Sequence, residues 1–170
     1  MVFTNDGSKI IAAQGKLVMY NAHDLSVFKT IAEWDRDLNF KSVAVAKDGR
    51  IGAGSREGHI IVWSPDGDEI LMKADKHINP LDNAYTALDI CFSPDGMHLL
   101  FSMTWYDDRH NLAVTSYTGA CGWLCICDSR TGEILHDIYL ETPFIRAIDC
   151  SEDYTIAAGS RNRIQIMQNT

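Results

Sequence analysis

The residues best suited to metal chemistry are three cysteines and one histidine in the second half of the chain. Thiolate and imidazole are ligands that zinc prefers, so Cys121, Cys125 and Cys127 with His110 form a candidate site. The spacing Cys-x3-Cys-x-Cys is not usual for a zinc knuckle, however. In a strand, Cys125 and Cys127 point to the same face, where small apolar side chains commonly pack into a core. We favour the core interpretation and predict neither a metal site nor a cofactor.

Residues for nucleophilic catalysis do not form a recognisable motif. The sequence contains no Gly-x-Ser-x-Gly elbow and no Gly-rich loop that would cradle a phosphate. Ser55 and Ser160 follow glycines but fall within or at the end of expected strands, where a hydroxyl more often bonds a neighbouring blade. The histidines lie mostly in expected turns, and the acidic runs at 66–69 and 107–108 lack the alternating oxygens that calcium needs. We therefore predict that the chain is not an enzyme.

Composition narrows the classes of partner. The chain has 170 residues, of which 46% are apolar, and this proportion suits a folded domain. Its 15 Lys and Arg against 23 Asp and Glu give a net charge of −8, which argues against a nucleic-acid-binding surface built on bulk positive charge. No segment approaches the ~20 apolar residues that span a bilayer, so we expect no membrane insertion. The odd number of cysteines favours a reducing intracellular compartment, cytoplasmic or nuclear, over a disulfide scaffold.

A pattern repeated four times organises the chain. Each repeat begins with a short apolar run, continues into a polar turn with an aspartate, and is followed by further apolar runs. The turn aspartates are Asp6, Asp48, Asp95 and Asp153, roughly 40 to 60 residues apart. The clearest internal echo is the motif Ala-Gly-Ser-Arg at 53–56 and again at 158–161, each time leading into a strand of the form Ile-x-apolar.

The local chemistry of the repeats predicts strands throughout. Asp-Gly after an apolar run is a strong hairpin signal, because Gly accepts a positive φ and Asp bonds the backbone nearby. No window keeps apolar residues at i, i+3, i+4 and i+7 beyond about three turns, which argues against helices. Four strands in units of roughly 42 residues are the signature of propeller blades. The sequence therefore predicts an all-β propeller region of about four blades, each of four antiparallel strands.

Several motifs resemble those of the WD-repeat (WD40-like) family. They are Phe92-Ser93-Pro94-Asp95-Gly96, Ala53-Gly54-Ser55 followed by Ile60-Ile61-Val62-Trp63, and the run 128–135. The Trp-Asp pair of that family appears as Tyr20-Asn21, Trp63-Ser64, Cys127-Asp128 and Met167-Gln168, so no unit carries both letters. The resemblance implies a hydrogen-bonded structural tetrad that is present only in part, best in unit two through Ser55, Glu57 and Trp63. It also implies structural blade positions at Asp95, Gly96 and Asp128.

The four units divide the whole chain into blades at approximately 1–39, 40–85, 86–143 and 144–170, the last without an outer strand. Propellers of this family usually have seven blades. A terminal blade in an unclosed arc exposes an apolar face and a free strand edge. We therefore predict an incomplete propeller: part of a larger one, a truncated form, or a chain whose first and last faces meet a partner, including by self-association. A closed ring of four blades is the less favoured alternative.

Both faces of an inner blade strand pack against neighbouring blades, so its apolar residues on either face are expected in the core. The predicted core residues are Val43, Val45, Ile61, Trp63, Leu88, Ile90, Phe92, Ile126, Ile148, Ile164 and Ile166.

Unit three carries a long insertion between its second and third strands, at 104–122. Loops of this length inside a compact blade are usually functional or disordered, and aromatic side chains beside charges are enriched at interface anchors. The alternative is a hairpin extension without a partner, and the sequence leaves both interpretations open. The predicted partner-binding residues are Trp105, Tyr106, Asp107, Asp108, Arg109, His110 and Tyr117.

A second surface feature is a set of arginines that follow the second strand of two units. If Arg56, Arg161 and Arg163 share one rim they form a local basic patch, and the simpler interpretation is that each is a solvated turn residue.

The WD-repeat resemblance implies a non-catalytic scaffold that binds partner proteins or peptides through blade loops and the propeller surface. Fold by itself does not establish this function. One alternative is a propeller-type hydrolase or a propeller that binds a small ligand, which would require polar residues converging on a central channel. Another is a purely structural arc of a larger propeller.

Overall fold

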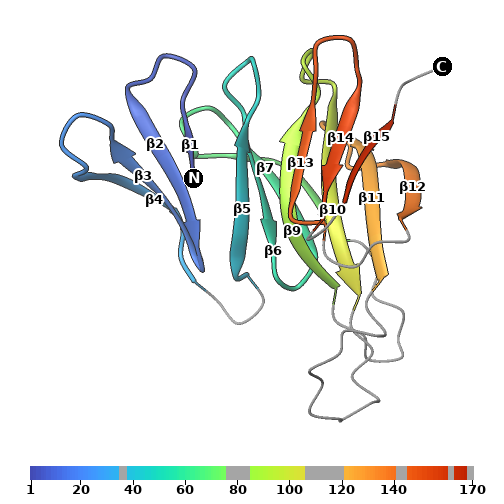
Figure 1. Cartoon of the computed structure of the whole chain (residues 1–170). Helices are drawn as coiled ribbons and strands as arrows, with labels where there is room; N and C mark the ends of the chain where they lie inside the picture. The colour runs from blue at the N-terminus through green and yellow to red at the C-terminus, as the bar shows by residue number, and fades with distance from the viewer. Residues whose placement is uncertain (35–37, 76–84, 106–120, 141–144, 161–162, 168–170) are drawn as a thin grey trace.

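The computed structural model describes residues 1–34, 38–75, 85–105, 121–140, 145–160 and 163–167 (Figure 1). These residues form strands, turns and short connections, and none of them is helical. The strands pair into four antiparallel sheets, in each of which neighbours in sequence are neighbours in space. The all-β fold built from blades is therefore confirmed. Within the same residues, no helix is present that could cross a membrane.

Blades one and two have four strands each, numbered from the inner strand outward. Blade one consists of β1 (Val2–Phe3), β2 (Lys9–Gln14), β3 (Lys16–Asn21) and β4 (Val27–Ala32). Blade two consists of β5 (Phe40–Val45), β6 (Ile51–Ser55), β7 (His59–Trp63) and β8 (Ile70–Asp75).

Blade three has longer strands, and blade four has three strands among the described residues. Blade three consists of β9 (Tyr85–Phe92), β10 (His98–Trp105), β11 (Cys121–Asp128) and β12 (Ile134–Leu140). Blade four consists of β13 (Ala147–Cys150), β14 (Ile156–Gly159) and β15 (Ile164–Met167).

The turns between first and second strands are closed by side chains as well as by backbone. In blade three, the Ser93 hydroxyl donates to the Asp95 carboxylate over 2.6 Å, and the same carboxylate accepts the N–H of Met97 over 2.9 Å. Gly96 has a φ of 70°, in the left-handed region that glycine adopts without strain. In blade four, Tyr154 takes the place of this glycine with a φ of 61°.

Successive blades pack through their inner strands and the sheet faces beside them. Strand β5 lies against β2 and β9, and β9 lies against β13. Every residue of β6 is buried, because blades one and three cover its two faces. A Cβ added at Gly52 would lie only 3.0 Å from the Phe92 ring, so the small residues of β6 let the next blade approach closely.

The predicted core is confirmed in blades two and three and wrong at two positions of blade four. Ile61, Trp63, Ile90, Phe92 and Ile148 are buried. Val43, Val45 and Ile126 are partly buried against the core, and the side chain of Leu88 lies outside the described residues. Ile164 and Ile166, predicted to be buried, are 75% and 68% exposed. They lie on the face of blade four that points away from blade three, and no other blade covers that face in the described chain.

The blades form an open row. Figure 1 shows blade one at one end of the row and blades three and four at the other, with blade two between them. The expected partial propeller is therefore confirmed, and the chain presents one sheet face at each end of the row.

Candidate protein-binding rim

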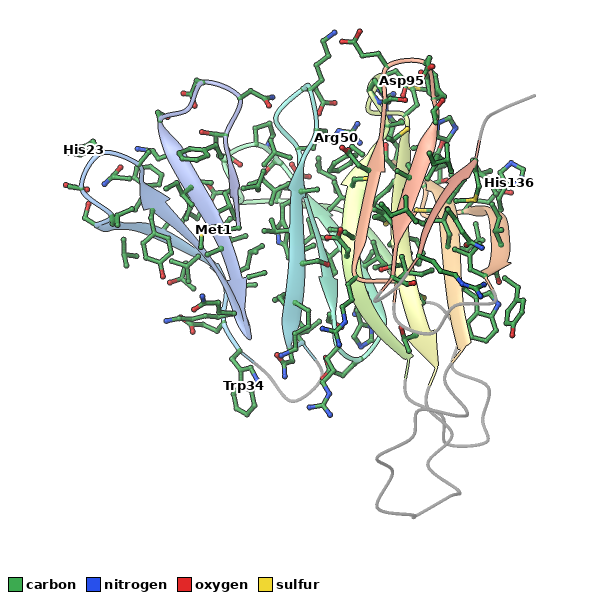
Figure 2. The ribbon with its side chains drawn as sticks, viewed as in Figure 1. Met1, His23, Trp34, Arg50, Asp95 and His136 are labelled. Carbon is green, nitrogen blue, oxygen red and sulfur yellow. The ribbon has the colours of Figure 1, made fainter. Side chains whose placement is uncertain are left out.

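The two ends of the sheets line up along the row as two rims. In an antiparallel meander, the turns from first to second strand and from third to fourth strand leave from one end of the sheet. The connections from second to third strand, and from one blade to the next, leave from the other end. The end with the turns from first to second and from third to fourth strand is called the turn rim. The opposite end is called the loop rim. Figure 2 places Arg50 and Asp95 at the turn rim and Trp34 at the loop rim.

Ionised aspartates line the turn rim. In four of its turns a Ser or Thr hydroxyl hydrogen-bonds to an aspartate two residues later, and this contact is the main cause of a lowered carboxyl pKa. For Asp6 and Asp95 the pKa falls to about 2. These carboxylates stabilise their own turns and make this rim negative at neutral pH. The four hydroxyl–carboxylate pairs are Thr4–Asp6, Ser64–Asp66, Ser93–Asp95 and Ser151–Asp153.

Arg50 lies buried at the turn rim between blades two and three. Its Nε donates to Asp48 Oδ2 over 2.7 Å, within its own turn. Its Nη2 donates to the carbonyl oxygen of Gly96 over 2.6 Å, and its Nη1 donates to Ser129 Oγ over 2.9 Å. The guanidinium carbon also lies 5.6 Å from the centre of the Phe92 ring. One cation therefore joins three turns of two blades.

The predicted structural positions of blade three belong to these turns. Asp95 and Gly96 form the turn described above. The Asp95 carboxylate also accepts a hydrogen bond from the Tyr154 hydroxyl of blade four, and this bond raises the pKa of Tyr154. Asp128 Oδ1 accepts the backbone N–H groups of Arg130 and Thr131, each over 2.8 Å. All three positions therefore stabilise the backbone of turns at the turn rim.

The predicted positions of blade two make separate contacts. The Ser55 hydroxyl is buried and accepts the N–H of Glu57 over 3.1 Å. The Glu57 carboxylate accepts the N–H of Asn39 over 2.9 Å. Trp63 packs edge-on against Phe40, with ring centres 5.6 Å apart. The described hydrogen bonds of Ser55 and Glu57 thus go to backbone amides, and they fix the loop-rim turn of blade two.

The loop rim carries an exposed aromatic ring and an exposed cation. Trp34 is 60% exposed, and a Cβ added at Gly15 would meet its ring at 3.1 Å. The Asn39 side chain borders the same glycine, and the carbonyl oxygen of Asn39 accepts the N–H of Arg56 over 2.8 Å. The Arg56 side chain is exposed. We call Gly15, Trp34, Asn39 and Arg56 the Trp34 patch.

The insertion of blade three leaves the sheet at the loop rim as well. Strands β10 and β11 stay paired as far as Trp105 and Cys121, so the insertion spans 106–120 and not 104–122. Thr104 and Gly122 are buried strand residues, because the hairpin continues through them. Trp105 belongs to β10 by its backbone, and its side chain lies outside the described residues. The other predicted partner-binding residues also lie outside them: Tyr106, Asp107, Asp108, Arg109, His110 and Tyr117.

Cys125 and Cys127 of β11 lie in the core, as their alternation predicts. Cys125 and Cys127 are buried against blade two, whereas Ile126 packs toward blade four. Burial raises the pKa of Cys127 to about 12, so this thiol is protonated at neutral pH. The side chains of Cys121 and His110 lie outside the described residues. In the part of the chain that is described, no three metal-binding side chains lie together.

Sequence reasoning missed Trp34. Its neighbours Glu33, Asp35, Arg36 and Asp37 surround one aromatic residue with charges, as happens at 105–109. An aromatic residue among charged residues was used to select 105–109, and the same pattern could have identified Trp34.

Comparison with known proteins identifies the fold. No family model and no curated protein matches this sequence. Among solved structures, the WD40 β-propeller domain of Doa1 superposes with a TM-score of 0.68 over 97% of this chain, at 19% sequence identity. The fold is that of a WD40 β-propeller. The chain spans about half of the Doa1 chain that it matches, 48% of its length. It is thus similar to an arc of such a propeller, and at this identity the similarity concerns the fold.

Exposed arginines lie on the loop rim of this propeller arc. Exposed arginines on the loop rim include Arg56, at the start of the turn after β6, and Arg163, immediately before β15. Arg146 adds a third exposed guanidinium just before β13. Arg161, the remaining member of the predicted basic patch, lies outside the described residues. The loop rim therefore offers exposed cations and the exposed ring of Trp34, and the turn rim offers carboxylates engaged in their own turns.

Proposed function

We propose that this WD40 arc is a non-catalytic scaffold that binds partner proteins or peptides through its loop rim. The observation that carries the proposal is the Trp34 patch. Trp and Arg are among the residue types most enriched at positions that dominate binding energy. Here both are exposed on the loop rim, and Asn39 links them, since its side chain borders Gly15 beside Trp34 and its carbonyl oxygen accepts the backbone N–H of Arg56. A partner segment that places an apolar side chain on the Trp34 ring and a carboxylate near Arg56 fits this surface.

The polar residues of the turn rim support a scaffold rather than a catalyst. A catalytic acid or base needs a pKa near the working pH, whereas Asp6 and Asp95 have pKa values of about 2. The buried guanidinium of Arg50 is occupied by partners within the fold. These groups hold turns together.

The insertion at 106–120 extends the proposed binding rim. Its two ends, Trp105 and Cys121, pair at the same end of the sheet as the turn that carries Arg56. We propose that the aromatic and charged residues between them contact the partner together with the Trp34 patch. A long insertion costs little closure entropy, so the blade folds with or without it.

Affinity capture from an intracellular extract, followed by cross-linking, tests the role of the Trp34 patch. The variants are Trp34→Ala and Arg56→Glu, and the matched control is Met97→Ala, an exposed apolar residue on the turn rim. Loss of a central Trp or Arg contact lowers the affinity for a partner by roughly tenfold or more, and the control leaves it unchanged. A partner set that both loop-rim variants retain in full would contradict this role.

A deletion tests the insertion separately. Residues 107–117 are replaced by a short Gly-Ser turn, and folding is checked by far-UV circular dichroism. The shortened chain is expected to stay folded and to lose at least one partner that the parent captures. If it captures all of them with equal affinity, the insertion is not part of the binding surface.

A further inference from the structure

Two cysteines lie on the inner strands of neighbouring blades, at the junction between blades three and four. Strand β13 of blade four lies against β9 of blade three. Cys91 of β9 and Cys150 of β13 both pack against the apolar cluster that joins these blades, which includes Leu100 and Ile148. Both cysteines are free thiols, and both are partly exposed. The junction therefore holds two thiols that small molecules in solution can reach.

Cys150 occupies a position that reaches across a blade junction. It directly precedes Ser151 in the turn of blade four, just as Phe92 directly precedes Ser93 in the turn of blade three. Phe92 reaches across the preceding junction and packs over Gly52 of blade two. The side chain of Cys150 accordingly points from blade four toward blade three, where its apolar cluster lies.

Cys91 occupies the position that such a residue meets. Cys91 pairs with Leu100 in blade three as Ala44 pairs with Gly52 in blade two. Cross-strand partners lie side by side on one face of a sheet, and the aromatic ring that packs over Gly52 shares one core cluster with Ala44. At the next junction, the same arrangement brings Cys150 to Leu100 and Cys91.

The ionisation of Cys91 is sensitive to Cys150. Burial is the main cause that raises the pKa of the Cys91 thiol, and the Cys150 thiol is the next, ahead of nearby carboxylates. Burial is also the main cause that raises the pKa of Cys150. The carboxylates that add to these effects are those of Asp149 and Asp89 for Cys91, and those of Asp149, Asp95 and Asp153 for Cys150. Both thiols are therefore protonated at neutral pH, and their oxidation becomes faster as the pH rises.

We propose that Cys91 and Cys150 form a modification site, at which hydrogen peroxide joins blades three and four through a disulfide. First, the thiolate of Cys150, the less buried of the two, attacks one peroxide oxygen. The O–O bond breaks, a sulfenic acid forms, and the other oxygen leaves as water with the proton that Cys150 released. The Cys91 thiolate then attacks the Cys150 sulfur, the S–O bond breaks, and the hydroxide leaves as water with the proton of Cys91. Two thiols and one peroxide thus give one disulfide and two waters.

A disulfide at this junction reinforces a contact that already joins the two inner strands. The N–H of Ile148 in blade four donates to Asp89 Oδ2 in blade three over 2.8 Å. A covalent bond beside this hydrogen bond opposes the separation of the two blades, and the closed loop of residues 91–150 also restricts the unfolded chain. Oxidation is therefore expected to slow the local opening of β13 and β14.

Peptide mapping of the folded parent chain tests the bond. Trypsin cleaves after Lys and Arg, so Cys91, the three cysteines at 121–127 and Cys150 fall in separate peptides, 77–109, 110–130 and 147–161. The chain is treated with hydrogen peroxide at mildly alkaline pH, and the remaining thiols are alkylated. Mass spectrometry is expected to find 77–109 linked to 147–161 with the loss of two hydrogens, and dithiothreitol is expected to release both peptides.

Variants that lack one sulfur test the assignment of the two partners. Cys150→Ser and Cys91→Ala are each expected to give no linked peptide. Alanine stands at the equivalent position of blade two, Ala44, so the second variant suits the packing of a blade junction. In that variant the oxidation of Cys150 is expected to stop at the sulfenic acid, which a 1,3-diketone traps. The matched control, Cys121→Ser, is expected to keep the link in full.

Hydrogen exchange measures whether the bond holds the blades together. In the oxidised parent chain, exchange in β13 and β14 is expected to slow by roughly tenfold or more relative to the reduced chain, with no change in β2. Cys150→Ser treated in the same way is expected to show no change. Three results would overturn the proposal: no link between 77–109 and 147–161 in the folded chain, a link from either peptide to 110–130 instead, or a link that leaves exchange in β13 and β14 unchanged.

Discussion

Arg50 of blade two donates from Nη2 to the carbonyl oxygen of Gly96 in blade three over 2.6 Å, and this contact ties together turns that are 46 residues apart. The same guanidinium reaches Ser129 in a second turn of blade three. Because Arg50 is buried, its removal leaves these carbonyl and hydroxyl groups without their donor in a site that water reaches poorly.

Arg50→Ala is therefore expected to lower the free energy of unfolding by about 3 kcal/mol, in the range found when one partner of a buried polar network is removed. Arg50→Lys is expected to recover only part of the loss, because an ammonium group cannot reproduce the planar fork. Urea unfolding of the two variants checks this. The control is Arg130→Ala, an exposed arginine on the same rim, and a loss below about 1 kcal/mol for Arg50→Ala would contradict the role.

Trp63 and Trp34 offer a matched pair for the energetics of burial. Trp63 is buried between blades one and two and packs edge-on against Phe40, whereas Trp34 is mostly exposed. Trp63→Ala is expected to cost roughly 3–5 kcal/mol through lost transfer energy and the cavity that it leaves. Trp34→Ala is expected to cost less than about 1 kcal/mol, because most of this side chain is already in water in the folded state. Equal losses in chemical denaturation would mean that the burial of Trp63 does not stabilise blade two.

The sequence predicted those parts of the fold that depend on local chemistry. The run Ser93-Pro94-Asp95-Gly96 contains its own hydroxyl, carboxylate and left-handed glycine, so its turn is encoded within a few residues. The alternation of Cys125, Ile126 and Cys127 likewise encodes which face each residue occupies. Such features need no knowledge of the rest of the molecule.

Features that depend on distant partners were not predictable in the same way. Nothing near Arg50 in the sequence indicates that it is buried, because its acceptors lie in another blade. Ile164 and Ile166 have the pattern of core residues, and their exposure depends on whether a further blade covers them. Trp34 lies against Gly15 on the loop rim. A pattern of strand residues does not show that these two residues meet.

Asp95 makes stability depend on pH in acid. Its folded-state pKa is about 2, below its ordinary value of 3.8, mainly because the Ser93 hydroxyl and the Met97 amide hydrogen-bond to the ionised form, with Tyr154 and His98 also favouring it. The unfolded chain therefore takes up this proton at a higher pH than the folded chain does. The stabilisation is complete well above pH 4 and is lost as the pH falls toward 2.

Asp95→Asn is accordingly expected to reduce the slope of unfolding free energy against pH between about pH 4 and pH 2. Denaturant unfolding across that interval measures the slope, with Glu152→Gln, an exposed carboxyl in the corresponding turn of blade four, as the control. If Asp95→Asn and the control change the slope equally, the hydrogen bonds of Asp95 do not account for the acid sensitivity of this turn.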